Sequence, residues 1–473
     1  MSGRTSQLRL NFDTLSSVIP WIRQRKDLLS FISTCSVLYR VGVPALLHFP
    51  CWITPRNLAP FHSFLLSKNP YSFLGIHDLT LTDYRGQPEM REDEAYMVKD
   101  ILNGAKKMEH LVVDDAMLRH IPTAYRALAT MQALQHLELE LGPDTMNELL
   151  AALAELHAPL RYLRVDYPWE PSRSNRIRNR ISMDIVAAFA NFCQTLEDVA
   201  FINISPRRIT PGDLRYTNVT TLYLSFADNM LLSMFVPAFP NLKSLHLEWL
   251  TAGRADNQRF QREHPEYSWR LETLTGDAES LYNIALQTMV CTVEISCQEA
   301  FSPDEVDQLR LAVDWLSEVL VDGQYELMRL DVELSLIDTT EVEDEDIHEK
   351  QLDSLFEQLA IVASSKPWLS LLYIHLTVLF DWYGDSEVSP ADAFVNSLDM
   401  REMASRAQLV IPNLQILCFK TWSLNAGGRF SWSYWAYEND DIVEVPFESC
   451  DAMESVFDKK TEEMIAASFS KTD

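Results

Sequence analysis

One short pattern recurs along most of the 473-residue chain: an apolar residue, two others, an apolar residue, one other, and a third apolar residue. Two clear copies read Leu134-Gln-His-Leu137-Glu-Leu139 and Leu242-Lys-Ser-Leu245-His-Leu247. The alternation within a copy is typical of a short strand with one buried face. Twelve copies follow one another, with central residues Leu79, Leu111, Leu137, Leu163, Val199, Leu222, Leu245, Leu274, Val293, Leu330, Ile374 and Leu417.

The spacing of the copies leaves room for a helix between most of them. The central positions span 338 residues over 11 intervals, or about 31 residues per repeat. Helical apolar spacing is present in residues 144–156, 181–192, 302–320 and 352–362. A strand and a helix cannot bury their apolar faces alone, so stacked repeats must share one core. The sequence therefore predicts an α/β fold: a strand–helix solenoid of about 12 irregular repeats over residues 51–425.

The first 50 residues do not carry the repeat. Residues 10–22, 27–40 and 43–47 have the apolar spacing of three short helices. A core of about 40 residues needs additional support. We therefore expect a partner or the solenoid to cover one face of this helical domain, residues 1–50.

Particular residues in this domain follow a known order. Leu10, Asn11, Asp13, Leu15, Val18 and Ile19 are followed by Asp27-Leu28, by Thr34-Cys35-Ser36-Val37-Leu38, and by Arg40, Val43, Pro44, Leu46 and Leu47. This order resembles an F-box. Together with the repeats, which resemble leucine-rich repeats, the chain is similar to the F-box/leucine-rich-repeat proteins of fungi.

The resemblance implies a function without covalent chemistry of its own. Such a chain is the substrate-recognition subunit of an SCF-type cullin–RING E3 ubiquitin ligase. Its F-box binds the adaptor subunit, and through it a cullin, while its repeats bind a target protein. The residues that the resemblance assigns to adaptor binding are Leu10, Asn11, Leu15, Val18, Ile19, Leu28, Leu29 and Leu38.

Two departures from the family pattern leave other interpretations open. Asn11 stands where the family has proline, and Leu38 where it has tryptophan. Both family residues help to bind the adaptor. The alternatives are a protein-binding scaffold with a degenerate F-box, a helical cap that only seals the first repeat, and a small-molecule-dependent co-receptor.

A cluster of arginines is the first candidate for target binding. Arg161, Arg164, Arg173, Arg176, Arg178 and Arg180 gather in a chain whose 40 Lys and Arg face 68 Asp and Glu, a net charge of −28. Guanidinium groups suit phosphate or carboxylate groups, so a phosphorylated target would fit. The alternative is a basic loop that neutralises nearby acids. The acidic run 341–346 is most simply a solvated loop, and its functional interpretation is a docking strip for a basic partner.

The C-terminal region, residues 426–473, is the second candidate. Phe430-Ser-Trp432-Ser-Tyr434-Trp435-Ala-Tyr437 predicts a hairpin strand that caps the open end of the core. Alternatively, Trp432 and Tyr434 form a recognition surface, since aromatic residues dominate binding hot spots. For residues 438–473 we expect an acidic cap: a solvated cap helix with a frayed end.

The remaining composition argues against most other functions. No metal-binding, nucleophile or phosphate-loop motif occurs, and only 13 glycines are present, so we expect no enzyme and no cofactor. The charge of −28 disfavours nucleic acid as a partner. Seven scattered cysteines, no visible secretory signal and no apolar stretch long enough for a membrane indicate a cytoplasmic and/or nuclear protein.

Overall fold

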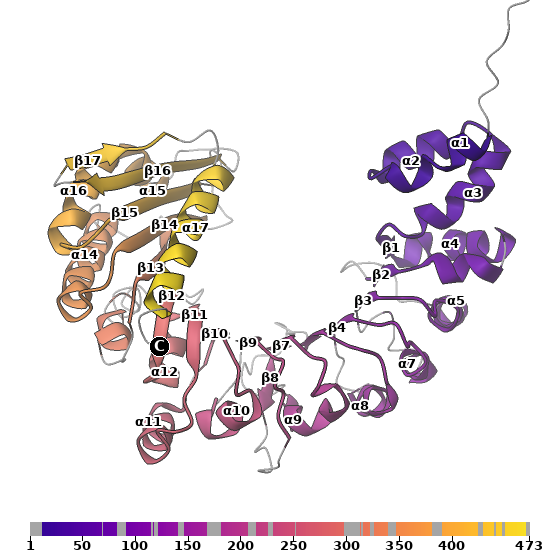
Figure 1. Cartoon of the computed structure of the whole chain (residues 1–473), viewed down its shortest axis with the longest axis horizontal. Helices are drawn as coiled ribbons and strands as arrows, with labels where there is room; N and C mark the ends of the chain where they lie inside the picture. The colour runs from indigo at the N-terminus through magenta and orange to yellow at the C-terminus, as the bar shows by residue number, and fades with distance from the viewer. Residues whose placement is uncertain are drawn as a thin grey trace, which may run out of the picture. The chain divides into compact units, whose positions relative to one another are not determined.

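The computed structural model describes residues 12–68, 70–82, 91–114, 117, 122–140, 146–167, 181–206, 214–225, 230–250, 252–297, 313, 316–321, 326–338, 347–380, 390–423, 429–438, 441–446 and 450–469. The chain divides into two compact units, Met1–Asn218 and Val219–Asp473. Each unit alternates strands with helices (Figure 1).

In the first unit, the described strands form a parallel sheet in the order β1-β2-β3-β4-β5-β7. These strands are β1 (Cys51–Ile53), β2 (Asp78–Leu81), β3 (His110–Val113), β4 (His136–Glu140), β5 (Tyr162–Asp166) and β7 (Asp198–Ile202), while β6 (Ile181–Met183) and β8 (Ile204–Pro206) pair separately. The helices are α1 (Phe12–Ser16), η1 (Ile19–Trp21), α2 (Arg25–Ile32), α3 (Ser36–Leu46), α4 (Pro55–Lys68), η2 (Pro70–Gly75), α5 (Glu92–Gly104), α7 (Pro122–Leu128), α8 (Met146–Glu155), α9 (Ile185–Ala188) and η3 (Ala190–Phe192).

In the second unit, the described strands run parallel from β9 to β15, and β16 and β17 are antiparallel. They are β9 (Thr221–Ser225), β10 (Ser244–Glu248), β11 (Arg270–Asp277), β12 (Met289–Cys297), β13 (Arg329–Asp338), β14 (Leu371–Phe380), β15 (Ile416–Ser423), β16 (Arg429–Glu438) and β17 (Asp441–Glu444). The helices are α10 (Leu232–Ala238), α11 (Arg254–Glu263), α12 (Ala278–Ile284), α14 (Ile347–Ser365), α15 (Pro390–Ser397), α16 (Met400–Val410) and α17 (Cys450–Phe469).

The apolar positions of the repeat pair with one another across the strands. In the first unit Leu79 pairs with Leu111, which is followed by Leu137, Leu163 and Val199 in the same register. All five side chains are buried. The expected α/β architecture is thus confirmed as parallel strands alternating with helices, which is compatible with a solenoid. The count of about 12 repeats stays a prediction.

The register corrects the sequence analysis at one repeat and extends it by one strand. Leu330 pairs with Leu372, and Leu372 pairs with Leu417, so the central residue of that copy is Leu372 and not Ile374. The run of apolar residues in β14 allows a shift of two positions, because such a shift keeps the same side chains on the same face. Before the first predicted copy, Cys51 pairs with Leu79 in β1.

Several expected helices are confirmed, and one begins later than expected. Helices α8 and α14 cover most of residues 144–156 and 352–362, and of residues 302–320 the described ones are helical. Residues 181–192, however, begin as strand β6, because Ile181 pairs with Ile204. A helix begins only after Asp184, whose carboxylate accepts a hydrogen bond from the Ala187 backbone N–H.

The N-terminal helices have a small core of their own. Ile19, Leu28 and Ile32 are buried together, with Phe31 and Tyr39 packed against them. Helices α2 and α3 approach so closely at Gly42 that a Cβ there would overlap the Ile32 side chain. The domain is helical as expected, but the expected helix over residues 27–40 is interrupted at residues 33–35, and the expected third segment is the end of α3.

A glycine in the second unit offers a test of the repeat packing. Gly276 occupies the last inward position of its repeat, where a Cβ would collide with the Leu247 carbonyl oxygen and lie 3.1 Å from Leu281 Cδ2. We expect Gly276→Ala to lower the free energy of unfolding by about 1–3 kcal/mol, because a backbone atom cannot give way as a side chain can. Denaturant unfolding measures this, with Thr273→Ala on the same strand as the control. Equal effects of the two substitutions would contradict the packing argument.

Candidate functional site

The outward face of the strands in the first unit carries a stack of rings. His110 pairs with His136, and His136 with Tyr162, across β3, β4 and β5. Their ring centroids are 4.9 and 4.0 Å apart, and both pairs are stacked. The histidine at position 136 lies on the outward face, as the alternation predicts. This face therefore offers flat ring surfaces beside polar groups, a combination suited to protein recognition.

Charged groups lie next to this stack. The His136 Nε2 and Glu138 Oε1 atoms are 2.8 Å apart, and this hydrogen bond holds the pKa of Glu138 below its ordinary value. The Arg164 guanidinium lies 3.6 Å from the Asp166 carboxylate. Burial raises the pKa of Asp166 above its ordinary value, although the nearby guanidinium opposes this shift. The face thus keeps charges of both signs at adjacent positions.

A shallow cavity of about 290 Å³ opens on the same face. Its lining combines the exposed ring of Trp52 and the side chain of Val112 with Glu138, Arg164 and Asp166. Ligand pockets usually span ~300–1,000 Å³, so this cavity fits a side chain of a protein partner better than an enclosed small molecule.

The second unit repeats this chemistry on β9 and β10. The Tyr223 and His246 rings stack 4.3 Å apart. Glu248 lies 2.8 Å from His246 Nε2 and accepts hydrogen bonds from Tyr223 at 2.7 Å and Ser225 at 3.3 Å. The hydrogen bond with His246, followed by that from Tyr223, lowers the pKa of Glu248 despite partial burial.

The residues assigned to adaptor binding separate into two groups. Val18 and Leu29 are exposed, and Leu15 is half-buried. Ile19, Leu28 and Leu38 are 5%, 0% and 2% exposed, because they fill the interior of the helical domain and its junction with the next elements. For these three the expectation of direct adaptor contact is wrong. Leu10 and Asn11 lie outside the described residues.

Three further apolar residues of this region were missed by the sequence analysis. Trp21 is 81% exposed, and Val37 and Val41 are 45% and 48% exposed. Val37 and Val41 lie one turn apart on α3, so the helical period could have placed them on one face opposite the buried residues. With Val18 and Leu29 they are exposed large apolar side chains of the N-terminal helices, and we call this set of five the N-terminal apolar surface.

The expected target-binding residues also divide. Arg161 is exposed and lies 3.6 Å from Glu197, and Arg164 lines the cavity. Arg173, Arg176, Arg178 and Arg180 lie outside the described residues, as does the acidic run 341–346. Tyr434 is buried in the core, so the expectation of a recognition role is wrong for it, whereas Trp432 is partly buried against the same cluster and its recognition role stays a prediction.

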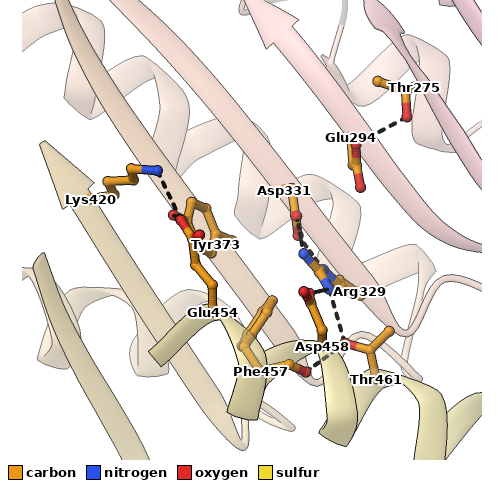
Figure 2. A network of polar contacts seen from close by, with 10 residues as sticks. All are labelled: Thr275, Glu294, Arg329, Asp331, Tyr373, Lys420, Glu454, Phe457, Asp458 and Thr461. Carbon is orange, nitrogen blue, oxygen red and sulfur yellow. Dashed lines mark hydrogen bonds and ion pairs between the residues drawn. The ribbon is translucent and has the colours of Figure 1, made fainter. Parts of the chain in front are cut away.

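The expected terminal hairpin is confirmed, but the following helix differs from expectation. Helix α17 packs on the outward face of the last strands through Met453 and Phe457, both fully buried. Figure 2 shows the polar contacts along this helix: Lys420 and Tyr373 meet Glu454, and Arg329 meets Asp331, Asp458 and Thr461. The acidic composition of the tail suggested a solvated helix and gave no signal for this packing.

Metal-binding side chains do not cluster among the described residues. No set of three or more His, Cys, Asp or Glu in the described ranges could hold a metal ion. Burial raises the pKa of Cys51 and Cys291 to about 11 and that of Cys297 to about 12, so these three thiols are protonated at neutral pH.

Comparison with known proteins adds no family assignment. Neither a protein-family model nor a curated protein matches the chain. Within the described part of the chain, no helix is long and apolar enough to cross a membrane.

The Glu248 contacts predict a pH-dependent stability. Its ionised form contributes fully above about pH 4.5, its ordinary pKa, and loses that contribution as the pH falls through the lowered value of the folded state. We expect Glu248→Gln to cost about 1 kcal/mol at pH 7 and progressively less in acid. Urea unfolding from pH 7 to pH 3 measures this difference.

A matched control is Glu272→Gln, which removes an exposed ion pair with Lys243. Exposed pairs contribute about 0–1 kcal/mol, so its effect should be smaller. A cost for Glu248→Gln that stays constant across the pH range would contradict the role of its charge.

Proposed function

We propose that the chain is the non-catalytic substrate-recognition subunit of an SCF-type cullin–RING E3 ubiquitin ligase. The N-terminal helices would bind the adaptor subunit, and the outward strand faces would bind a target protein. The contribution of the chain is proximity, since it holds the target beside an enzyme that transfers ubiquitin.

The observation that carries this proposal is the N-terminal apolar surface. The helices already bury Ile19, Leu28 and Ile32 in a core, yet Trp21 and Leu29 stay 81% and 50% exposed. Five exposed large apolar side chains on so small a helical domain support an interaction site there. An adaptor subunit bound to these side chains would bury their apolar area. That area would stay exposed to water if the domain only sealed the first repeat.

The outward strand face of the first unit supports the second half of the proposal. Its stacked rings, its charges of both signs and the cavity beside Trp52 form a surface whose chemistry differs from that of the uniform leucines on the inward face. Interface cores are enriched in aromatic residues and arginine.

One observation favours a second candidate, a protein-binding scaffold with a degenerate F-box. Leu38 occupies the position to which the family gives a tryptophan, and its side chain is buried. It therefore offers no surface to an adaptor. In this candidate the strand face would bind proteins without any link to a ligase.

Adaptor binding distinguishes the two candidates. We expect the full chain to bind the purified adaptor, and the double substitution Leu29→Glu and Val41→Glu to weaken binding at least about tenfold, which corresponds to ~1.4 kcal/mol. Leu409→Glu on α16, at a side chain that is 82% exposed, is the matched control and should leave binding unchanged. Failure of the unmodified chain to bind the adaptor would favour the scaffold.

Target recognition can be tested separately through the strand face. We expect Trp52→Glu to remove a subset of the proteins labelled by a proximity enzyme fused to the chain, because Trp52 supplies the exposed ring at the cavity. Trp368→Glu introduces the same change at another exposed tryptophan, 69% accessible, and should leave the labelled set intact. Identical labelled sets for both variants and the unmodified chain would argue against this face.

A further inference from the structure

Helix α17 lies on the opposite side of its strands from the other helices of the second unit. Helix α16 packs against β15 on the side shared with α14, whereas α17 crosses the outward face of β13–β16 (Figures 1 and 2). Its Met453 and Phe457 are buried against Leu371, Tyr373, Ile416, Cys418 and Tyr434. The outward face thus forms a groove that holds an amphipathic helix, and we call it the α17 groove.

Two cationic residues of the strands bind carboxylates of the helix. Lys420 Nζ donates a hydrogen bond to Glu454 at 2.8 Å, and the Tyr373 hydroxyl donates to the same carboxylate at 2.9 Å. Arg329 donates to Asp458 at 2.7 Å, and its guanidinium lies 4.4 Å from the centre of the Phe457 ring. The helix is therefore recognised by apolar residues at i and i+4 and by carboxylates at i+1 and i+5.

Beside the apolar cluster, a buried ion pair lies beneath the helix. On the inward face of β13, Leu330, Val332 and Leu334 are at most 1% exposed. On the outward face, under α17, the corresponding buried side chains are the ion pair Arg329 and Asp331, only 12% and 16% exposed, with nitrogen–oxygen distances of 2.7 and 2.5 Å.

The presence of a buried ion pair beneath α17 has a physical reason if α17 can dissociate from the groove. Apolar residues of similar volume hold a permanently packed element at least as well as a buried ion pair does. An apolar face would, however, become an aggregation-prone patch once uncovered. The pair Arg329 and Asp331, with Lys420, keeps one part of the groove polar in both situations, beside the apolar residues that contact Met453 and Phe457.

We propose that the α17 groove is a binding site for an acidic amphipathic helix of a partner protein, and that α17 occupies this site in its absence. The partner helix carries apolar residues at i and i+4 and carboxylates at i+1 and i+5, as Met453, Phe457, Glu454 and Asp458 do. A basic helix is disfavoured because it would face Arg329 and Lys420. This inference does not depend on the proposed ligase role.

Binding of a helix in trans tests the proposal in the full chain. The probe is a fluorescent peptide with the sequence of residues 450–469, followed by anisotropy. Because α17 competes at a high effective concentration, we expect weak binding to the unmodified chain. The double substitution Glu454→Lys and Asp458→Lys reverses both carboxylates and releases α17, so the peptide should then bind at least about tenfold more tightly.

Two controls separate recognition from charge alone. The double substitution Glu462→Lys and Glu463→Lys reverses two exposed charges on the same helix and should leave peptide binding as weak as in the unmodified chain. A peptide that carries lysine in place of Glu454 and Asp458 should not bind the released chain. Equal binding of both peptides would overturn the proposed recognition.

Hydrogen exchange shows whether α17 can leave without loss of the fold. In the released variant we expect the α17 amides to exchange rapidly while those of β14 stay protected. In the unmodified chain, exchange in α17 should rise with salt more than in α14, since salt screens the ion pairs. Loss of protection in β14 together with α17 would mean that the helix is an integral part of the core and would overturn the proposal.

Discussion

The structure depends on the in-register pairing of apolar side chains between neighbouring parallel strands. Leu137 meets Leu111 on one side and Leu163 on the other, and each is fully buried. A strand of four or five residues has no stable existence alone, so each repeat takes its stability from its neighbours. A shift by one residue would place this leucine column in water, whereas the run of apolar residues in β14 accommodates a shift by two.

The alternation of inward and outward side chains along each strand also decides where binding can occur. Inward positions are fixed by packing, but outward positions are free to carry any residue that tolerates a half-buried surface. In the first unit they carry the His110–His136–Tyr162 stack and the charges of Glu138 and Arg164. In the second unit they carry Arg329 and Lys420, which meet carboxylates of α17. Recognition surfaces thus arise from the positions that the core does not constrain.

The sequence predicts elements better than it predicts their partners. The alternation located β2 to β5 because each copy has its own buried face, and helices α8 and α14 follow from their apolar spacing. In residues 181–183 the helical spacing was misleading, because pairing with β8 determines the local structure. The resemblance assigns both adjacent leucines, Leu28 and Leu29, to adaptor binding. Leu28 is buried and Leu29 is exposed because of the way α2 packs on α3, which the sequence pattern does not reveal.

The charge of the chain explains why the contacts of α17 could not be anticipated from composition. With 68 acidic and 40 basic residues, most acidic side chains have no reason to be near a cation, and an acidic tail is expected to remain in water. Arg329 and Lys420 change this because they stand on outward positions of β13 and β15, within reach of one helix face. Burial opposes the charge of Arg329, but the Asp331 and Asp458 carboxylates outweigh it and raise its pKa. Two well-placed cations, together with the burial of Met453 and Phe457, therefore hold an acidic helix on a strongly acidic protein, and the strand register supplies the placement of the cations.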